Sequence, residues 1–193
     1  MRYSSSKFKK FKWQYLITIF VVLLTYGRDE VYFFNGLGGE NWTIGFAKAN
    51  IGNSLPGRSL TELSDFALML VNRDRQLNGL SPLEKDSLIT KTAQLHAEDM
   101  AKRNYFSHGT PEGLSPTDRY VKLGGLNGIG ENIVFREGGA SRLSYAIVEV
   151  FQRSLMYSDG HRQNLLNPNY TKFGYGIAVD PLSRKIYAVQ NFQ

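Results

Sequence analysis

The sequence contains no cysteine among its 193 residues. Disulfides, thiolate metal ligands and a cysteine nucleophile are therefore excluded. Any folded part of the chain has to be held together by its apolar core alone. With 42% hydrophobic and 13% aromatic residues, the composition is ordinary for a globular domain and is sufficient for a sizeable core.

Acidic residues are missing from positions 1–27, where five basic side chains precede an uncharged, mostly apolar run at residues 13–26. A basic segment followed by a short apolar segment is typical of a secretory signal peptide or a signal anchor. The run has 14 residues, whereas a helix that crosses a bilayer needs roughly 20. A weak cleavage site follows Gly27, so both alternatives stay open. We expect the C-terminal part to be exported, either secreted or anchored on the outer face of the cytoplasmic membrane.

The rest of the chain lacks an excess of charge of either sign. The net charge of +6 comes almost entirely from the N-terminal segment, because residues 28–193 hold 18 basic and 17 acidic side chains. Binding to nucleic acid requires a basic face that neutralises phosphates. We therefore expect no nucleic-acid partner.

Regular hydrophobic spacing begins only at Ser59. Residues 28–58 show no sustained period and are interpreted as a linker or spacer. Ser59 and Glu62 fit a capping box, and the apolar positions after them predict a helix that ends at Asn78. A second helix is predicted over residues 86–103, and the turn-rich stretch 104–120 after it is interpreted as an ordered loop.

The second half of the chain mixes helical and extended patterns. A short strand is predicted at residues 131–135 and a third helix at 145–156. Two β-branched and aromatic segments, 175–179 and 185–192, predict a hairpin at the end of the chain. Helices between short strands indicate a layered α+β domain that occupies residues 59–193.

Histidine is scarce, since the chain has three. His96 falls on the apolar stripe of the second predicted helix, which is typical of a core histidine satisfied by a hydrogen bond. His108 follows Tyr105 and Phe106, and we expect these two aromatic side chains to pack against the core and position it. His161 lies in SDGHRQNLLNP, a polar stretch that reads as a turn.

Six short motifs occur in order along the chain: VNRDRQLNGLSPL (71–83), LHAEDMA (95–101), YFSHGTPEG (105–113), GEN (130–132), SDGHRQNLLNP (158–168) and GYGIAV (174–179). Together they resemble the CAP superfamily, which includes cysteine-rich secretory proteins, antigen 5 and plant pathogenesis-related proteins. The chain looks most similar to its cysteine-free exported bacterial branch, over about residues 60–193. The resemblance implies a three-layer α-β-α sandwich with a shallow cleft on one side.

The resemblance also implies which residues form the cleft. His108 of FSH, Glu131 of GEN and His161 of GHR match the family's motifs. Ser158 stands where the family has its second glutamate, as it often does in the bacterial branch. Leu155 stands where the family tends to have tryptophan. A four-residue site is therefore expected to be incomplete, although the fold assignment is unaffected.

Neighbours of His161 are expected to fix its loop. Gly160 is expected to let the backbone turn without a Cβ clash and so to aim the imidazole into the cleft. Arg162, Asn164 and Asn167 are expected to tie the loop down through hydrogen bonds from side chain to backbone.

Two neutral imidazoles and a carboxylate are reasonable ligands for Zn²⁺ or a similar divalent cation, so His108, His161 and Glu131 are the candidate metal ligands. One hypothesis is a metal-dependent hydrolase or protease, with His108, Glu131, Ser158 and His161 as candidate catalytic residues. The other is a non-catalytic extracellular binding module for a lipid, a glycan or a cell-wall fragment. The missing second acid favours binding, because a candidate general acid is absent. A purely structural polar cluster is the third alternative.

Overall fold

The computed structural model describes residues 42–45, 57–137 and 143–193. The predicted signal or anchor segment and most of the predicted linker lie outside these residues. Within the described ranges, no helix is long and apolar enough to cross a membrane.

The described elements alternate along the chain as the sequence predicts. The helices are α2 (Leu60–Leu77), α3 (Ser87–Arg103), α4 (Pro116–Lys122), α5 (Tyr145–Tyr157) and α6 (Asp159–Leu165), and the strands are β1 (Glu84–Lys85), β2 (Gly130–Arg136), β3 (Lys172–Val179) and β4 (Ile186–Phe192). The three predicted helices correspond to α2, α3 and α5, and the predicted strands correspond to β2, β3 and β4. These assignments are confirmed to within a few residues.

Two short helices lie where the sequence predicts only loops. Residues 104–120 were interpreted as an ordered loop, yet α4 begins at Pro116 after a capping box formed by Ser115 and Asp118. Residues 158–168 were interpreted as a turn, yet α6 occupies most of this stretch. Both interpretations were wrong because turn-forming residues also begin helices, and Ser-Pro followed by Asp is itself a signal for a helix start.

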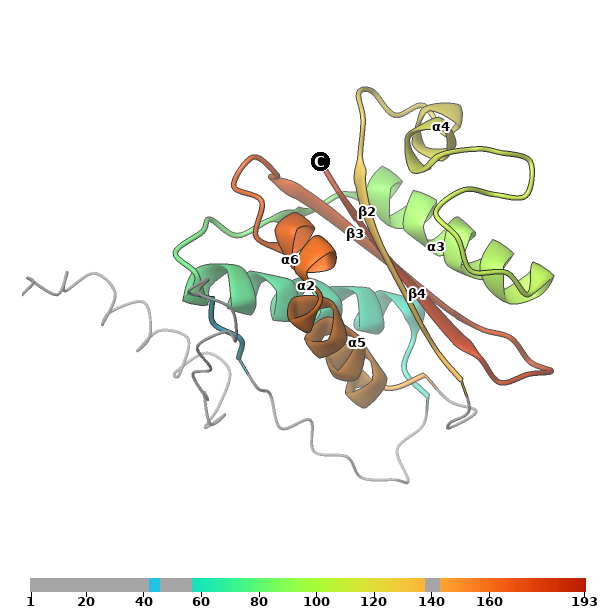
Figure 1. The fold of residues 1–193 in the computed structure, drawn as a ribbon, viewed down its shortest axis with the longest axis horizontal. Coiled ribbons are helices and arrows are strands. Elements are labelled where there is room, and N and C mark those ends of the chain that lie inside the picture. The colour runs from blue at the N-terminus through green and yellow to red at the C-terminus, as the bar shows by residue number, and fades with distance from the viewer. Residues whose placement is uncertain (1–41, 46–56, 138–142) are drawn as a thin grey trace, which may run out of the picture.

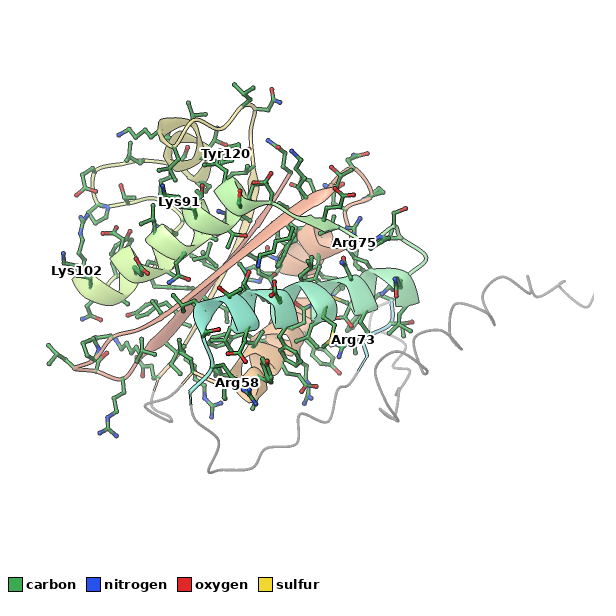
Figure 2. All side chains as sticks on the ribbon, turned by 180° about the vertical axis from the view of Figure 1, so that it is seen from behind. Arg58, Arg73, Arg75, Lys91, Lys102 and Tyr120 are labelled. Atoms are coloured by element: carbon green, nitrogen blue, oxygen red, sulfur yellow. The ribbon has the colours of Figure 1, made fainter. Side chains whose placement is uncertain are left out.

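The four strands form one mixed sheet in the order β1-β3-β4-β2. β1 runs parallel to β3, whereas β3 pairs antiparallel with β4 and β4 pairs antiparallel with β2. Helices α3 and α4 lie on one side of the sheet, and α2, α5 and α6 lie on the other (Figure 1; seen from behind in Figure 2). The α+β sandwich is confirmed, and β2 forms one of its edges.

The two faces of β3 are packed in different ways. Phe173, Tyr175 and Ile177 belong to the large apolar cluster shared with α2 and α5. Gly174 and Gly176 face α3, and a Cβ atom at either position would overlap the backbone of that helix near Thr90 or Gln94. α3 therefore lies directly on the backbone of β3, and this close approach fixes the helix that carries His96.

The close approach predicts a large cost for any side chain at position 176. Gly176→Ala is expected to lower the free energy of unfolding by about 3 kcal/mol, because the overlapping atoms are helix backbone that cannot move aside. Urea unfolding followed by circular dichroism measures the change.

Gly160→Ala is the matched control, because a Cβ at Gly160 meets no atom within 4 Å. It is expected to change stability by less than about 1 kcal/mol and in the stabilising direction, since Gly160 lies in α6. Equal losses in the two variants would contradict the packing described for α3 and β3.

Candidate functional site

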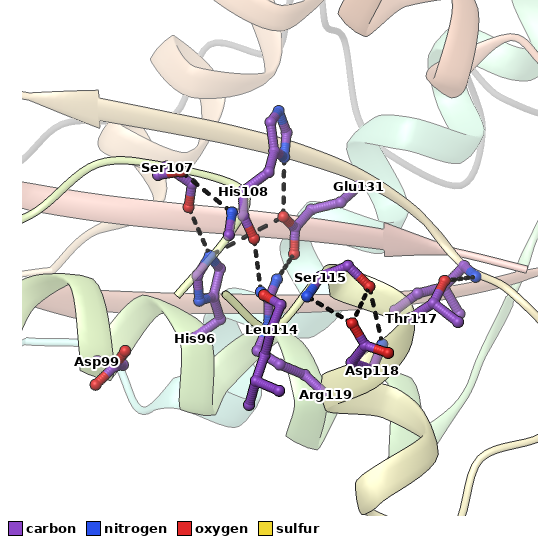
Figure 3. A network of polar contacts seen from close by, with 12 residues as sticks. His96, Asp99, Ser107, His108, Leu114, Ser115, Thr117, Asp118, Arg119 and Glu131 are labelled. Carbon is purple, nitrogen blue, oxygen red and sulfur yellow. Dashed lines mark hydrogen bonds and ion pairs between the residues drawn. The ribbon is translucent and has the colours of Figure 1, made fainter. Parts of the chain in front are cut away.

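The site is built around the buried carboxylate of Glu131, near the start of β2. Its side chain is 1% exposed. The Nδ1 atom of His108 donates to Oε1 of Glu131 at 2.9 Å, and Nη2 of Arg119 donates to Oε2 at 2.6 Å. Figure 3 shows these contacts between β2, the loop after α3 and helix α4. Both carboxylate oxygens are therefore engaged inside the protein.

Arg119 is a site residue that the sequence reading missed. Besides its ion pair with Glu131, its Nη1 atom donates to the carbonyl oxygens of His108 at 2.6 Å and Leu114 at 3.2 Å. It therefore fixes the carboxylate and the loop backbone at once. The signal that could have found it is the capping box Ser115–Asp118, which starts a helix and so places Arg119 in α4, directly after Asp118.

His96 supports the same loop from below. Its ring is fully buried, and Nε2 lies 3.0 Å from the carbonyl oxygen of Ser107, to which it donates. The predicted role of a satisfied core histidine is confirmed. The same Nε2 atom lies 4.0 Å from Oε1 of Glu131, so the ring also borders the carboxylate (Figure 3). Burial lowers the pKa of His96 below its ordinary value of 6.5, which keeps the ring neutral near pH 7.

His161 reaches the cleft from the other side of the sheet. Its Nδ1 atom lies 2.8 Å from Oγ of Ser158, the residue at which α5 ends and α6 begins. Burial, and then the nearby His108, lower the pKa of His161. The expected role of Gly160 was wrong, since this residue lies in helix α6 and a Cβ there would meet nothing.

The expected role of the polar residues after His161 is confirmed. Arg162 donates to the carbonyl of Met156 at 3.0 Å, and Asn164 donates to the carbonyl of Glu131 at 3.2 Å. Asn167 accepts from the backbone N–H of Asn169 at 2.9 Å. The bond from Asn164 holds α6 against β2, and the bond from Arg162 holds it against the end of α5, so that together they keep His161 in place.

A buried chain of side-chain amides connects α6 to the opposite end of the core. In the order given below, each amide donates to the group before it at 2.8 to 3.3 Å, and the last amide, Asn132, also donates to the carbonyl of His161 at 3.1 Å. The members run from α2 through α5, β4 and β2: Asp74, Gln152, Gln190 and Asn132. Because buried polar groups are costly when unpaired, the chain fixes the position of α6 relative to the sheet.

The two histidines line one cleft of about 510 Å³. Its lining is Phe106, Ser107, His108, Ile133, Val134, Phe135 and His161. The ring of Phe106 is 43% exposed and lies 4.6 Å from that of Phe135. The expected packing of Phe106 against the core was therefore wrong, because this side chain forms a wall of the cleft instead.

The predicted site residues occupy different positions relative to this cleft. His108 and His161 line it, Ser158 contacts His161 behind it, and Glu131 lies beneath His108. Leu155 is buried in the main apolar cluster. Among the described residues, no three histidine, aspartate or glutamate side chains are grouped so that they could hold a metal ion. The structure shows the oxygens of Glu131 bonded to His108 and Arg119. Its role as a direct metal ligand stays a prediction.

The arrangement leaves one nitrogen of each cleft histidine for a ligand. A carboxylate accepts from His108 Nδ1, so this nitrogen carries the proton and Nε2 keeps its lone pair. Oγ of Ser158 lies 2.8 Å from Nδ1 of His161 and holds that ring through the same nitrogen, although a hydroxyl can donate or accept and so does not set the tautomer. An imidazole held through one nitrogen is the usual form of a histidine that binds a metal through the other.

The fold and the cleft together match the α-β-α module that the sequence motifs suggested. The model of the cysteine-rich secretory protein (CAP) family matches residues 68–192, and the chain belongs to this family.

Two proteins of Bacillus subtilis are similar to the chain in sequence. YkwD of Bacillus subtilis (strain 168) is 35% identical over 130 residues, 67% of this chain and 47% of YkwD. The membrane protein YlbC of the same organism is 35% identical over 127 residues, 65% of this chain and 32% of YlbC. The chain therefore spans less than half the length of these relatives.

A solved structure shares both sequence and fold. It is an extracellular protein from Bacillus anthracis that contains an SCP domain, with 31% identity and a TM-score of 0.56 over 68% of this chain and 40% of that one.

The buried ion pair predicts a strong coupling between Glu131 and Arg119. Glu131→Gln and Arg119→Met are each expected to destabilise the protein by about 3 to 5 kcal/mol, because each leaves one buried charge without its partner. The double variant is expected to lose less than the sum of the two, by about 1 to 3 kcal/mol. Chemical unfolding of the four proteins checks this, and additive losses would contradict the pairing.

The lowered pKa values of His96 and His161 predict that stability falls in mild acid. The unfolded chain binds protons at pH values where the folded rings remain neutral, so the free energy of unfolding decreases as pH falls below about 6.5. His96→Gln retains a donor for the Ser107 carbonyl but cannot titrate, and it is expected to flatten this decrease. Unfolding at pH 7.5 and 5.5 measures it, and an unchanged pH dependence in His96→Gln would contradict the neutral buried ring.

Proposed function

We propose that the chain is an extracellular or cell-envelope module that binds a ligand in the cleft between His108 and His161 without turning it over. The ligand classes that the sequence suggested are a lipid, a glycan and a cell-wall fragment. A cleft lined by two imidazoles, one hydroxyl-bearing residue and apolar side chains suits recognition by such contacts.

The observation that carries this proposal is the state of Glu131. A hydrolase that uses these residues needs a carboxylate free to take or give a proton at the substrate. Both oxygens of Glu131 are bonded, to His108 and Arg119, and its side chain is 1% exposed. The carboxylate therefore positions His108 instead of facing a substrate, which favours binding over the hydrolase or protease alternative.

A divalent cation such as Zn²⁺ fits the two histidines as part of this function. His108 and His161 would hold it through Nε2, while Glu131 and Ser158 fix the other nitrogen of each ring. A bound Zn²⁺ would supply a Lewis acid that attracts an oxygen or nitrogen atom of the ligand. Two protein ligands leave other positions of the ion for the ligand or water.

The proposed location rests on two independent observations. The first 27 residues have the layout of a signal peptide or signal anchor. The Bacillus anthracis protein that shares the fold at 31% identity is extracellular. An anchor at residues 13–26 would keep the domain at the outer face of the membrane, and cleavage would release it.

Calorimetric titration of Zn²⁺ into the full-length chain tests the site. We expect binding at pH 7.5 that weakens strongly at pH 5.5, because metal-binding imidazoles must lose their protons. We expect His108→Ala/His161→Ala to bind no Zn²⁺ while it keeps its circular dichroism spectrum. His96→Gln is the control, because His96 lies beneath the loop and outside the cleft lining.

Two results would contradict the proposal. If the folded wild-type chain binds no Zn²⁺, the part of the proposal that places a metal ion in the cleft is wrong. Hydrolysis of a peptide or ester by the Zn²⁺-loaded wild type, lost in the double variant, would replace the binding role with the hydrolase alternative.

A further inference from the structure

Within the part of the chain that the structure describes, strand β2 is an edge of the sheet, and it lies in the cleft. It is the last strand in the order β1-β3-β4-β2, and β4 covers only one of its sides. Three of its residues, Ile133, Val134 and Phe135, line the cleft between the two histidines. The cleft is therefore partly made of backbone, which carries hydrogen-bonding groups at a fixed spacing.

The strand register shows which backbone groups point outward. Lys172 and Gln193 form two backbone hydrogen bonds with each other, at 2.8 and 3.1 Å. The N–H and C=O groups of the odd-numbered residues of β4 therefore point toward β3. The N–H and C=O groups of the even-numbered residues of β4 point toward β2, where Gln190 lies opposite Asn132 and Ala188 lies opposite Val134.

The N–H and C=O groups of the odd-numbered residues of β2 must then point away from the sheet. The carbonyl of Glu131 does so, because it accepts from Asn164 at 3.2 Å. Ile133 and Phe135 come next along the same edge. Ile133 is buried, with 5% of its surface exposed, and Phe135 is 38% exposed, so the edge opens toward the C-terminal end of β2.

The opposite side of the sheet shows how this chain closes an edge. There, the side-chain amide of Gln94 both donates to the carbonyl and accepts from the N–H of Ile177, each at 3.0 Å. Among the described residues, no side chain makes the equivalent pair of bonds with Ile133 or Phe135. Since exposed edges promote unwanted pairing and are usually covered, an open edge inside a cleft indicates a binding surface.

The walls of the cleft suit the side chains of an extended chain. Phe106 and His108 come from the loop after α3, and His161 comes from α6. A strand beside β2 would direct alternate side chains toward these two walls. Alternate residues of a strand, such as 133 and 135, lie about 6.7 Å apart, and an extended peptide has the same spacing between its alternate residues.

The charges of the cleft limit which peptides fit. Its lining contains two imidazoles and no carboxylate. Arg136 is exposed at the open end of β2, and the nearby Glu137 is paired with Lys185 at 3.5 Å. The site therefore favours a neutral or acidic peptide over a basic one.

We propose that the cleft binds an extended, neutral or acidic peptide segment that adds to the sheet beside β2 through the outward N–H and C=O groups of Ile133 and Phe135. The proposal rests on the binding role of the cleft and names the chemical class of its ligand. This mode of recognition takes its affinity from main-chain hydrogen bonds and its specificity from alternate side chains.

The experiment uses a pooled library of acetylated, amidated heptapeptides with valine or threonine at alternate positions and aspartate or glutamate near one end. Peptides that the full-length chain retains are resynthesised with a fluorescent label, and their dissociation constants are measured by polarisation. N-methylation of the residues that pair with β2 is expected to weaken binding about tenfold or more, because two main-chain hydrogen bonds are lost. N-methylation of the intervening residues is expected to have a much smaller effect.

A pair of protein variants tests the same bonds from the other side. Phe135→Pro removes the outward N–H, and an edge strand tolerates proline at such a position. Phe135→Ala removes the same ring and keeps the N–H, so it is the matched control. Phe135→Pro is expected to bind the selected peptides about tenfold more weakly than Phe135→Ala, with circular dichroism spectra that show both variants folded.

The outcomes separate this proposal from the proposed function. Zn²⁺ binding at the two histidines without any retained peptide overturns the peptide proposal alone. If the folded wild-type chain binds neither Zn²⁺ nor any peptide, both the proposed function and the peptide proposal are wrong. Equal peptide affinities for Phe135→Pro and Phe135→Ala, or binding of phospholipid vesicles or glycan fragments in place of peptides, would also contradict recognition through the backbone of β2.

Discussion

The buried carboxylate of Glu131 is the group on which one wall of the cleft depends. Through Arg119 it is joined to α4, and through His108 to the loop after α3. A charge with 1% of its side chain exposed is tolerated only where partners replace the lost water. Arg119 supplies the opposite charge and also bonds to the loop carbonyl of His108. The placement of His108 is thus a consequence of neutralising Glu131.

The other wall is fixed by a separate set of contacts. α6 is held to β2 by Asn164 and by the buried chain of amides that ends at the carbonyl of His161. The two histidines therefore belong to different layers of the sandwich, and they meet only across the edge of β2. This arrangement explains why the two cleft histidines lie far apart in the sequence. It also places the open backbone of β2 between the two imidazoles, where a ligand would contact both.

The regular elements could be predicted because their signals are local. The capping box at Ser59 and the spacing of apolar residues define α2, and the alternating aromatic and β-branched residues define β3 and β4. Ordered motifs also identified His108 and His161. These signals need no knowledge of what lies beside each segment in space.

The contacts that position the site could not be predicted in the same way. Arg119 pairs with a carboxylate 12 residues away only because α4 and β2 are brought together. Phe106 became a wall of the cleft because Phe135 lies on an edge strand. Gly160 was assigned a steric role although the true steric demand falls on Gly174 and Gly176, which face a helix from a distant part of the sequence.

Both oxygens of Glu131 are bonded inside the protein, and the bond to Nδ1 of His108 leaves Nε2 of that ring for the cleft. The protonation of each imidazole nitrogen can be measured by long-range ¹H–¹⁵N NMR of the histidine side chains at pH 7.5. We expect neutral His108 to carry its proton on Nδ1, and we expect Glu131→Gln to remove this preference. A neutral His108 protonated on Nε2 in the wild type, unchanged in Glu131→Gln, would contradict this expectation.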